Sequence, residues 1–492
     1  MHDPTLTRRE VLALLAAAAC VPAPDLDDLP PPPASLGDDP FRLGVTCGDP
    51  TPTGFVLGTR LAVDPLAPGG GMPPDPVSVG WEVARDRAFE DVVVASWTTV
   101  EAAQAHAVHA VIDGLADHEV YFYRFVVGAW TSPVGRARTA PAEGRTVDRL
   151  RLAIASCQDF RDGHWTAWQD LVDHEPDLVL FVGDYIYESG GAGVRAHLGG
   201  EAEDLEGYRQ RYAQYRAEPT LQAAHAVAPW VVTWDDHEVD NDYAGTDPDP
   251  AATARRDAAW QAFREHMPVR APWPPEPGPF RLHRRLGWGT LAELLVLDTR
   301  QHRSGPGDHD DPARTMLGAA QRDWAFAQIE GGEAAWAVLV QSLVLSDLSF
   351  GGAIVHDDQW DGFAVERRAL LEACGRRGGV VVASGDRHAS LLGRPFVPGS
   401  DDPVAVEVCG NSISSDGDGE PAEIVVKAAW ANLDGVDHAQ SRYRGWALVD
   451  LLPEVAEITF RAVETVLEPG AEVFDLARYR VARGSYALDE LS

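Results

Sequence analysis

One stretch of the sequence decides the fold, and it reads Asp177-Leu178-Val179-Leu180-Phe181-Val182-Gly183-Asp184. A continuous apolar run of this length is typical of a strand that is buried on both faces. Similar runs occur at residues 150–157, 228–235, 292–298 and 379–386. Helix-like stretches, such as 208–225 and 361–377, lie between several of them. Apolar strands that alternate with helices predict an α/β fold with a largely buried sheet.

The region from 41 to 141 has a different hydrophobic pattern. Short runs of alternating apolar residues, such as 77–83 and 120–127, are separated by Gly, Pro and Asp. Several short strands with turns between them predict a small β-sandwich of the fibronectin III or immunoglobulin-like kind. Leu115, Tyr121 and Tyr123 resemble the tyrosine-corner region of fibronectin type III domains. We therefore expect a β-sandwich domain at 41–141 and an α/β domain at 149–485.

The first twenty residues predict a targeting segment. Arg8 and Arg9 precede a short apolar run at 11–19 that is too short to span a bilayer. The paired arginines resemble the signal of the twin-arginine export machinery, so we expect a periplasmic, secreted or cell-surface protein. The residues before Cys20 loosely resemble a lipoprotein box, which leaves a lipid anchor there open. Residues 21–40 are rich in Pro and Asp and predict an extended linker.

The charge balance excludes one class of partner. The chain has 492 residues and a formal net charge of −35. Such an acidic surface repels polyanions, so we expect no non-specific nucleic-acid binding. Lys427 is the single lysine, so the other basic residues are arginines, which can hold phosphate oxygens in a bidentate way. Besides Cys20 there are four scattered cysteines, which indicate neither a disulfide framework nor a zinc knuckle but leave one disulfide open.

The predicted strands end in residues that can bind metals. Cys157 follows the first and Asp184 the second, while Asp235, Asp236 and His237 follow the third, and Asp386 and His388 follow the last. Ligands of open α/β sheets bind at the carboxyl ends of the strands, so we expect these side chains to converge. Carboxylates and Asn suit hard cations, whereas thiolate, imidazole and phenolate suit a transition metal. Two neighbouring metal ions would suit phosphoryl transfer, because they activate a bound water and stabilise both the attacking and the leaving oxygen.

Six segments in a fixed order resemble the alkaline phosphatase D (PhoD-like) family of the calcineurin-like metallophosphoesterase superfamily. They are 155–158, 181–188, 234–241, 297–301, 384–388 and 412–415. The preceding β domain and the paired arginines match as well, so the resemblance covers nearly the whole mature chain. It implies a layered α/β sandwich core and an exported, metal-dependent phosphoesterase. Its substrates would be phosphomonoesters, and phosphodiesters are left open. Metal-activated hydroxide would attack the phosphorus in line.

The resemblance also implies a ligand set. Fe³⁺ would be held by Cys157, Asp184 and Tyr187, completed by Asp386 or His388. Ca²⁺ would be held by Asp184, Asp236, Asn241 and the other member of that pair. From spacing alone, zinc or manganese at Cys157 stays open.

The remaining predicted roles concern the substrate. His237 matches the histidine that contacts phosphate and assists the leaving group, and its ordinary pKa suits an acid near neutral pH. Arg300 and Arg387 are predicted phosphate clamps, because a guanidinium fits two phosphate oxygens, although salt bridging is the ordinary alternative. Asp242 stands where the family pattern has Asn, and Cys409 precedes the last motif where a Cys is unusual. These departures affect the pocket rim and therefore substrate choice.

Three other functions compete with this reading. An enzyme of the same fold could act mainly as a phospholipase D or phosphodiesterase, which depends on pocket width. A secreted binding protein with structural metals would bind ligand without turnover. A metal-dependent amide hydrolase fits the Cys and Tyr ligands poorly.

Overall fold

The computed structural model describes residues 26–245, 249–350, 354 and 356–491. The predicted signal at 1–20, including Cys20, lies outside the described residues. Part of the expected linker is described, and it is not simply extended. Leu26–Asp28 form a turn of 3-10 helix, and Leu36 is buried in the core of the N-terminal β region. Among the described residues, we find no helix with the length and apolar character needed to cross a membrane.

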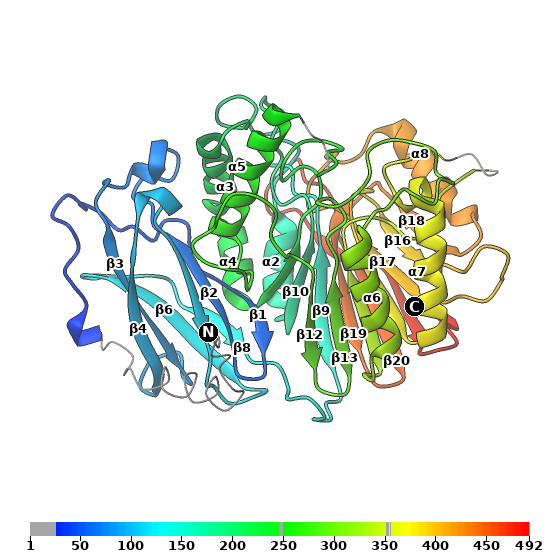
Figure 1. Ribbon diagram of the computed structural model, residues 1–492, viewed down its shortest axis with the longest axis horizontal. Helices are drawn as coiled ribbons and strands as arrows, with labels where there is room; N and C mark the ends of the chain where they lie inside the picture. Colours follow the sequence, from blue (N-terminus) through cyan, green and yellow to red (C-terminus); the bar gives the residue numbers. More distant parts are fainter. Residues whose placement is uncertain (1–25, 246–248, 351–353, 355, 492) are drawn as a thin grey trace, which may run out of the picture.

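Two sheets form the centre of the molecule, and the predicted apolar runs supply three neighbouring strands of the first and two strands of the second (Figure 1). The first has the order β22 (Leu488–Leu491), β21 (Val473–Ala482), β20 (Val455–Val463), β19 (Arg444–Leu451), β9 (Leu150–Ala155), β10 (Leu178–Val182), β11 (Trp230–Thr233), β1 (Thr46–Thr51), β2 (Gly54–Arg60) and β5 (Ala107–Ile112). The second has the order β12 (Arg284–Trp288), β13 (Ala292–Val296), β14 (Trp336–Val340), β15 (Val380–Ser384), β17 (Val406–Gly410), β16 (Ser390–Gly393) and β18 (Val436–Gln440).

Four layers result from the packing of these sheets. The largest apolar core lies between them and joins residues such as Leu180 of β10 to Val338 of β14. A second core packs the outer face of the first sheet against helices, and a third does the same for the second sheet. The helices of the first layer are α2 (Thr166–Asp173), α3 (Leu205–Arg216), α4 (Pro219–Val227) and α5 (Pro250–His266), and those of the last are α6 (Ala319–Gly331) and α7 (Ala364–Arg377). The layered α/β prediction is therefore confirmed.

The N-terminal β region shares a sheet with the α/β part. One of its sheets contains β4 (Val92–Val100), β3 (Val77–Ala84), β6 (Val120–Val127), β7 (Trp130–Thr131) and β8 (Gly135–Arg138). The other, made of β1, β2 and β5, continues the ten-stranded sheet, because Gly48 of β1 pairs with Trp230 of β11. A side chain at Gly48 would meet the Trp230 carbonyl oxygen at 2.4 Å, so this close approach requires glycine. The Tyr121 hydroxyl accepts a hydrogen bond from the Ala116 N–H at 3.1 Å, as in a tyrosine corner.

The cysteines form no disulfide in the described part of the chain. Cys47, Cys157, Cys374 and Cys409 are all free and buried. The disulfide that the sequence leaves open is therefore absent among them.

Candidate functional site

The carboxyl ends of β9, β10, β11 and β15 meet at one edge between the two sheets. β10 is parallel to both β9 and β11 in the first sheet, and β15 lies in the facing sheet. Residues that follow β9, β10 and β15 have left-handed backbone, with φ of 56° at Cys157, 57° at Asp184, 61° at Asp386 and 47° at His388. Non-glycine residues rarely adopt this conformation, and such strain clusters at functional sites. The turns direct these side chains toward one another.

Cys157, Asp184 and His388 form the first cluster. One side-chain atom of each lies within 4.8 Å of the others. The Tyr187 hydroxyl joins them, at 3.0 Å from Asp184 Oδ2 and 3.2 Å from His388 Nε2. The His388 Nδ1–H donates to Asp416 Oδ2 at 2.8 Å, which leaves Nε2 directed at the cluster. Sulfur, phenol, imidazole and carboxylate donors together suit a transition metal.

Asp236 lies at the centre of the second cluster. It belongs to one close group with Asp235 and Asp386 and to another with Asp242 and Asp358. These groups also connect to the first cluster. One side-chain atom each of Asp184, Asp236 and His237 lies within 4.8 Å of the others. An all-oxygen set of this kind suits a hard cation such as Ca²⁺.

The buried donors fit a cation. Asp184 is 1% exposed, and its Oδ1 has no hydrogen-bond partner. Burial raises the pKa of Cys157 well above its usual value, and the Asp184 charge raises it further. Burial also raises the pKa of Asp184 and of Tyr187. A bound cation would relieve these costs, because it attracts the carboxylate, thiolate and phenolate forms that burial disfavours.

His237 lies beside both clusters. Its Nδ1–H donates to Glu188 Oε2 at 2.8 Å, and its ring stacks on Tyr187 with 4.2 Å between centroids. Burial lowers the pKa of His237, but the carboxylates of Asp236 and Asp184 outweigh it and raise that pKa well above its usual value. The Nε2 side is left for the pocket that His237 lines.

A pocket of about 490 Å³ opens over the clusters. Seven of its lining residues are predicted site residues, namely Arg387 and the six residues Asp184, Asp236, His237, Asn241, Asp386 and His388. The Nη2 of Arg387 hydrogen-bonds to His356 Nε2 at 2.7 Å. The volume is in the usual range for small-molecule sites.

Arg300 does not fit its predicted contact with phosphate. Its side chain is fully buried, and its Nε donates to Asp235 Oδ1 at 2.6 Å while Nη2 pairs with Asp358 Oδ2 at 2.9 Å. It is not among the residues that line the pocket. Its guanidinium instead holds the aspartates behind Asp236. Cys157 and Tyr187 likewise sit beneath the pocket lining, within the first cluster.

Sequence reasoning missed several supporting residues. Glu238 accepts hydrogen bonds from the main-chain N–H groups of Asp184, Tyr185 and Asp235. Lys427, on α8 (Pro421–Ala429), lies 3.4 Å from Asp416 and 3.1 Å from Glu423 at the pocket wall. Glu238 lies inside the family segment 234–241, and Lys427 is the single lysine of the chain, so the sequence could have pointed to both residues. Asp416 and Asp358 carried none, because only the fold brings them to the site.

The fold and site thus define a layered α/β protein with a cluster of side chains at its strand ends that could hold metal ions. Comparison with known proteins gives the family. The PhoD-like phosphatase family model matches residues 152–460, and the model of its N-terminal domain matches residues 28–141. The chain belongs to the PhoD-like phosphatase family.

Two relatives agree with this assignment. Alkaline phosphatase D of Bacillus subtilis (strain 168) is 38% identical over 489 residues, which cover 92% of this chain and 82% of the relative. A solved structure of PhoD superposes with a TM-score of 0.87 at 36% identity and covers 93% of both chains. The resemblance to the alkaline phosphatase D family that the motifs indicate is therefore confirmed.

Proposed function

We propose that this chain is an exported, metal-dependent phosphoesterase that hydrolyses phosphomonoesters in the pocket over the two clusters. The observation that carries the proposal is the convergence of Cys157, Asp184, Asp236 and His388 beneath that pocket. Membership of the PhoD-like phosphatase family supports phosphate ester hydrolysis. The buried, unpartnered Asp184 Oδ1 supports the dependence on a cation.

The donor chemistry supports a division of the ligands between two ions. Cys157, Tyr187 and His388 would hold iron, with Asp184 shared between both ions. Asp236, Asn241 and Asp386 would hold calcium. The proximity of His388 to Cys157, and of Asp386 to Asp236, favours this choice for the pair that the sequence left open. When bound, such ions activate water and stabilise charge on phosphate oxygens.

The protein's own residues would then orient and protonate the substrate. Arg387, at the pocket wall, would bind phosphate oxygens. His237, held by Glu188, would donate a proton to the leaving oxygen. Arg300 would act as a positioning residue, because its ion pair fixes Asp235 next to Asp236. The pocket volume of about 490 Å³ leaves room for a phosphodiester, which is the second candidate substrate.

The export proposal rests on residues outside the described part of the chain. Arg8 and Arg9 before an apolar run would direct the folded, metal-loaded protein to the twin-arginine machinery. Replacement of both arginines by lysine should keep the enzyme inside the cell. Export of that variant at the normal level would contradict the route.

One experiment tests the catalytic proposal. Elemental analysis of the purified protein is paired with phosphate release from p-nitrophenyl phosphate and from its bis-ester, before and after treatment with a chelator. We expect iron and calcium in the sample, and release that falls with chelation and returns with calcium. The ratio of the two esters decides between monoesterase and diesterase. Metal-replete protein that cleaves neither ester would overturn the proposal.

His237→Asn separates catalysis from metal binding. The asparagine keeps a polar group against Glu188 but cannot donate the proton, so phosphate release should fall about 100-fold or more while the metal content is unchanged. Unchanged release would assign the proton transfer to another group.

A further inference from the structure

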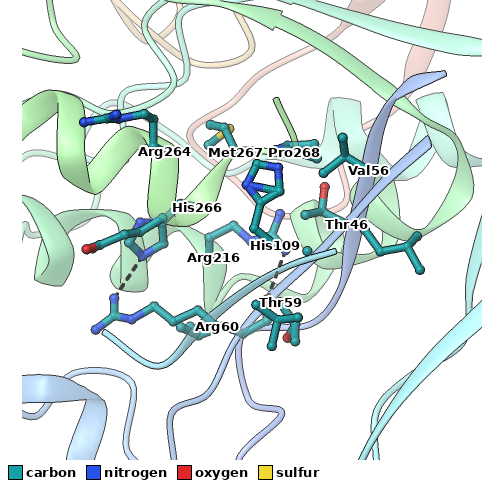
Figure 2. A pocket seen from close by; sticks show the side chains of 15 residues that line it. Thr46, Val56, Thr59, Arg60, His109, Arg216, Arg264, His266, Met267 and Pro268 are labelled. Carbon is teal, nitrogen blue, oxygen red and sulfur yellow. Dashed lines mark hydrogen bonds between the residues drawn. The ribbon is translucent and has the colours of Figure 1, made fainter. Parts of the chain in front are cut away.

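A second, smaller cavity lies where the N-terminal β region meets the helices of the α/β part, away from the pocket described above. It measures about 20 Å³. Its polar lining residues come from β1, β2 and β5 and from the ends of α3 and α5, and Figure 2 labels most of them: Thr46, Thr59, Arg60, His109, Arg216, Arg264, Glu265 and His266. The chain has a net charge of −35, yet this wall is rich in arginine.

Arg216 is the central residue of this cavity. It is 3% exposed, and its Nη2 donates to the carbonyl oxygens of Leu43 and Val45, both at 3.2 Å. Its buried Nη1 has no hydrogen-bond partner. The Tyr185 hydroxyl is hydrogen-bonded to His225 Nε2 at 2.8 Å and also contacts the Arg216 guanidinium; burial raises the pKa of Tyr185, and the Arg216 charge opposes that rise. Among the described residues Arg216 forms no ion pair, which is unusual because buried charges are ordinarily paired.

Arg60 adds a second buried charge, and burial lowers the pKa of Arg60 to about 10 although the Glu265 carboxylate acts against this. Its Nη1 donates to the Arg209 carbonyl and to His266 Nε2, both at 2.9 Å. The His266 Nδ1–H donates to the Ala262 carbonyl, so Nε2 is the acceptor and the ring is neutral. Glu265 also lines the cavity, but Arg209 holds its carboxylate through two hydrogen bonds of 2.7 and 2.5 Å.

His109 supplies another donor. Neither of its ring nitrogens has a hydrogen-bond partner, and its ring meets the Trp273 ring edge-on at 5.2 Å. Burial lowers the pKa of His109 to about 4, so the neutral ring carries one N–H. Both His109 and Arg216 line the cavity, and Figure 2 labels both side chains. His109 also lines an outer groove of about 570 Å³.

We propose that this cavity binds one monatomic anion of the halide class, between Arg216 Nη1 and the His109 N–H. The volume suits one occupant of about the size of water and excludes a tetrahedral oxyanion such as phosphate. A neutral water would satisfy the donors but leave the Arg216 guanidinium without an ion pair. The anion would join β2 and β5 of the N-terminal region to α3, and so would stabilise the junction without taking part in hydrolysis.

Thermal unfolding of the full chain tests this proposal. Melting is followed in sodium chloride or bromide and in sodium gluconate at equal ionic strength. A ligand that binds the folded state alone raises the Tm with its concentration, here by about 1–3 °C for each tenfold increase in halide. Arg216→Gln should abolish this halide dependence, whatever its effect on the absolute Tm.

Arg264→Gln is the matched control. Arg264 lines the same cavity, but its guanidinium donates to the carbonyl oxygens of Trp260 and Glu276. This variant should melt at a lower temperature yet keep the halide dependence. Equal Tm values in halide and gluconate, or the same dependence in Arg216→Gln as in the unchanged protein, would overturn the proposal.

A bromide-soaked crystal of the unchanged protein gives a second measurement that does not depend on a variant folding. We expect an anomalous peak beside Arg216 Nη1. Density at that position without anomalous signal would identify a water and overturn the proposal.

Discussion

Glu238 holds the ends of β10 and β11 together, so its replacement should damage both stability and the site. The side chain is 1% exposed. Its Oε2 accepts hydrogen bonds from the N–H groups of Asp184 at 3.1 Å and Asp235 at 2.9 Å, and Oε1 accepts from Tyr185 at 2.6 Å. Glu238→Gln preserves the shape but changes one oxygen into an NH₂ group. The best amide orientation keeps its oxygen on the two N–H groups and turns the NH₂ toward Tyr185.

The magnitude follows from these three contacts. The variant loses one hydrogen bond to a charged group, worth about 1.5–3 kcal/mol, and it leaves the Tyr185 N–H buried without an acceptor. The other two hydrogen bonds weaken, because charge-assisted hydrogen bonds are about twice as strong as neutral ones. Burial raises the pKa of Glu238 to about 7, so removal of the buried charge returns part of the loss. We expect a net loss of about 2–3 kcal/mol in the free energy of unfolding.

Urea unfolding measures this loss, and phosphate release measures the effect on the site. Because Glu238 orients Asp184, activity should fall about 10–100-fold, as for other groups that orient metal ligands. Glu468→Gln, at an exposed position, is the control and should change stability by less than about 0.5 kcal/mol. Suppose that the free energy of unfolding of Glu238→Gln lies within about 0.5 kcal/mol of that of the unchanged protein and that the variant keeps full activity. The three hydrogen bonds of Glu238 would then not hold the strand ends in place, and the reasoning would be refuted.

Two further substitutions test the site. Cys157→Ser removes the thiolate from the first cluster, so iron content by elemental analysis should drop strongly. Cys374→Ser, a buried thiol outside the site, should leave it unchanged, and equal iron in both variants would remove Cys157 from the ligand set. Lys427→Met takes the ammonium away from Asp416, which orients His388, so kcat/KM should fall up to about 10-fold, whereas Lys427→Arg should retain most of it. Equal activity of Lys427→Met and the unchanged protein would show that Asp416 needs no counter-ion.

The layered fold was predictable because its strands are buried on both faces. The runs around β9, β10, β11, β13 and β15 are continuous and apolar, and a buried parallel sheet requires such runs. β14 and the strands from β19 to β22 were not predicted. β20 alternates and β22 has only 4 residues, so both resemble surface segments, whereas β14 is an apolar run like β10. The expected single helix at 208–225 is two helices, α3 and α4, because Pro219 begins a new helix after Glu218.

The sequence by itself determined the chemistry of the site. Cys157, Asp184, Asp236 and His388 follow apolar strands, and chain order with residue type was enough to predict that they converge. The family motifs made the PhoD-like assignment available before any coordinates.

Tertiary structure alone decided which of these residues can touch a substrate. Arg300 and Arg387 had the same predicted role from the sequence. In the structure Arg300 is buried in an ion pair with Asp235, whereas Arg387 lines the pocket. The sequence also did not predict the parallel pairing of β1 with β11 or the arginine-rich cavity beside Arg216. The physical reason is the same in each case, because burial and the pairing of charges depend on neighbours that are distant in the chain and come together only in the folded protein.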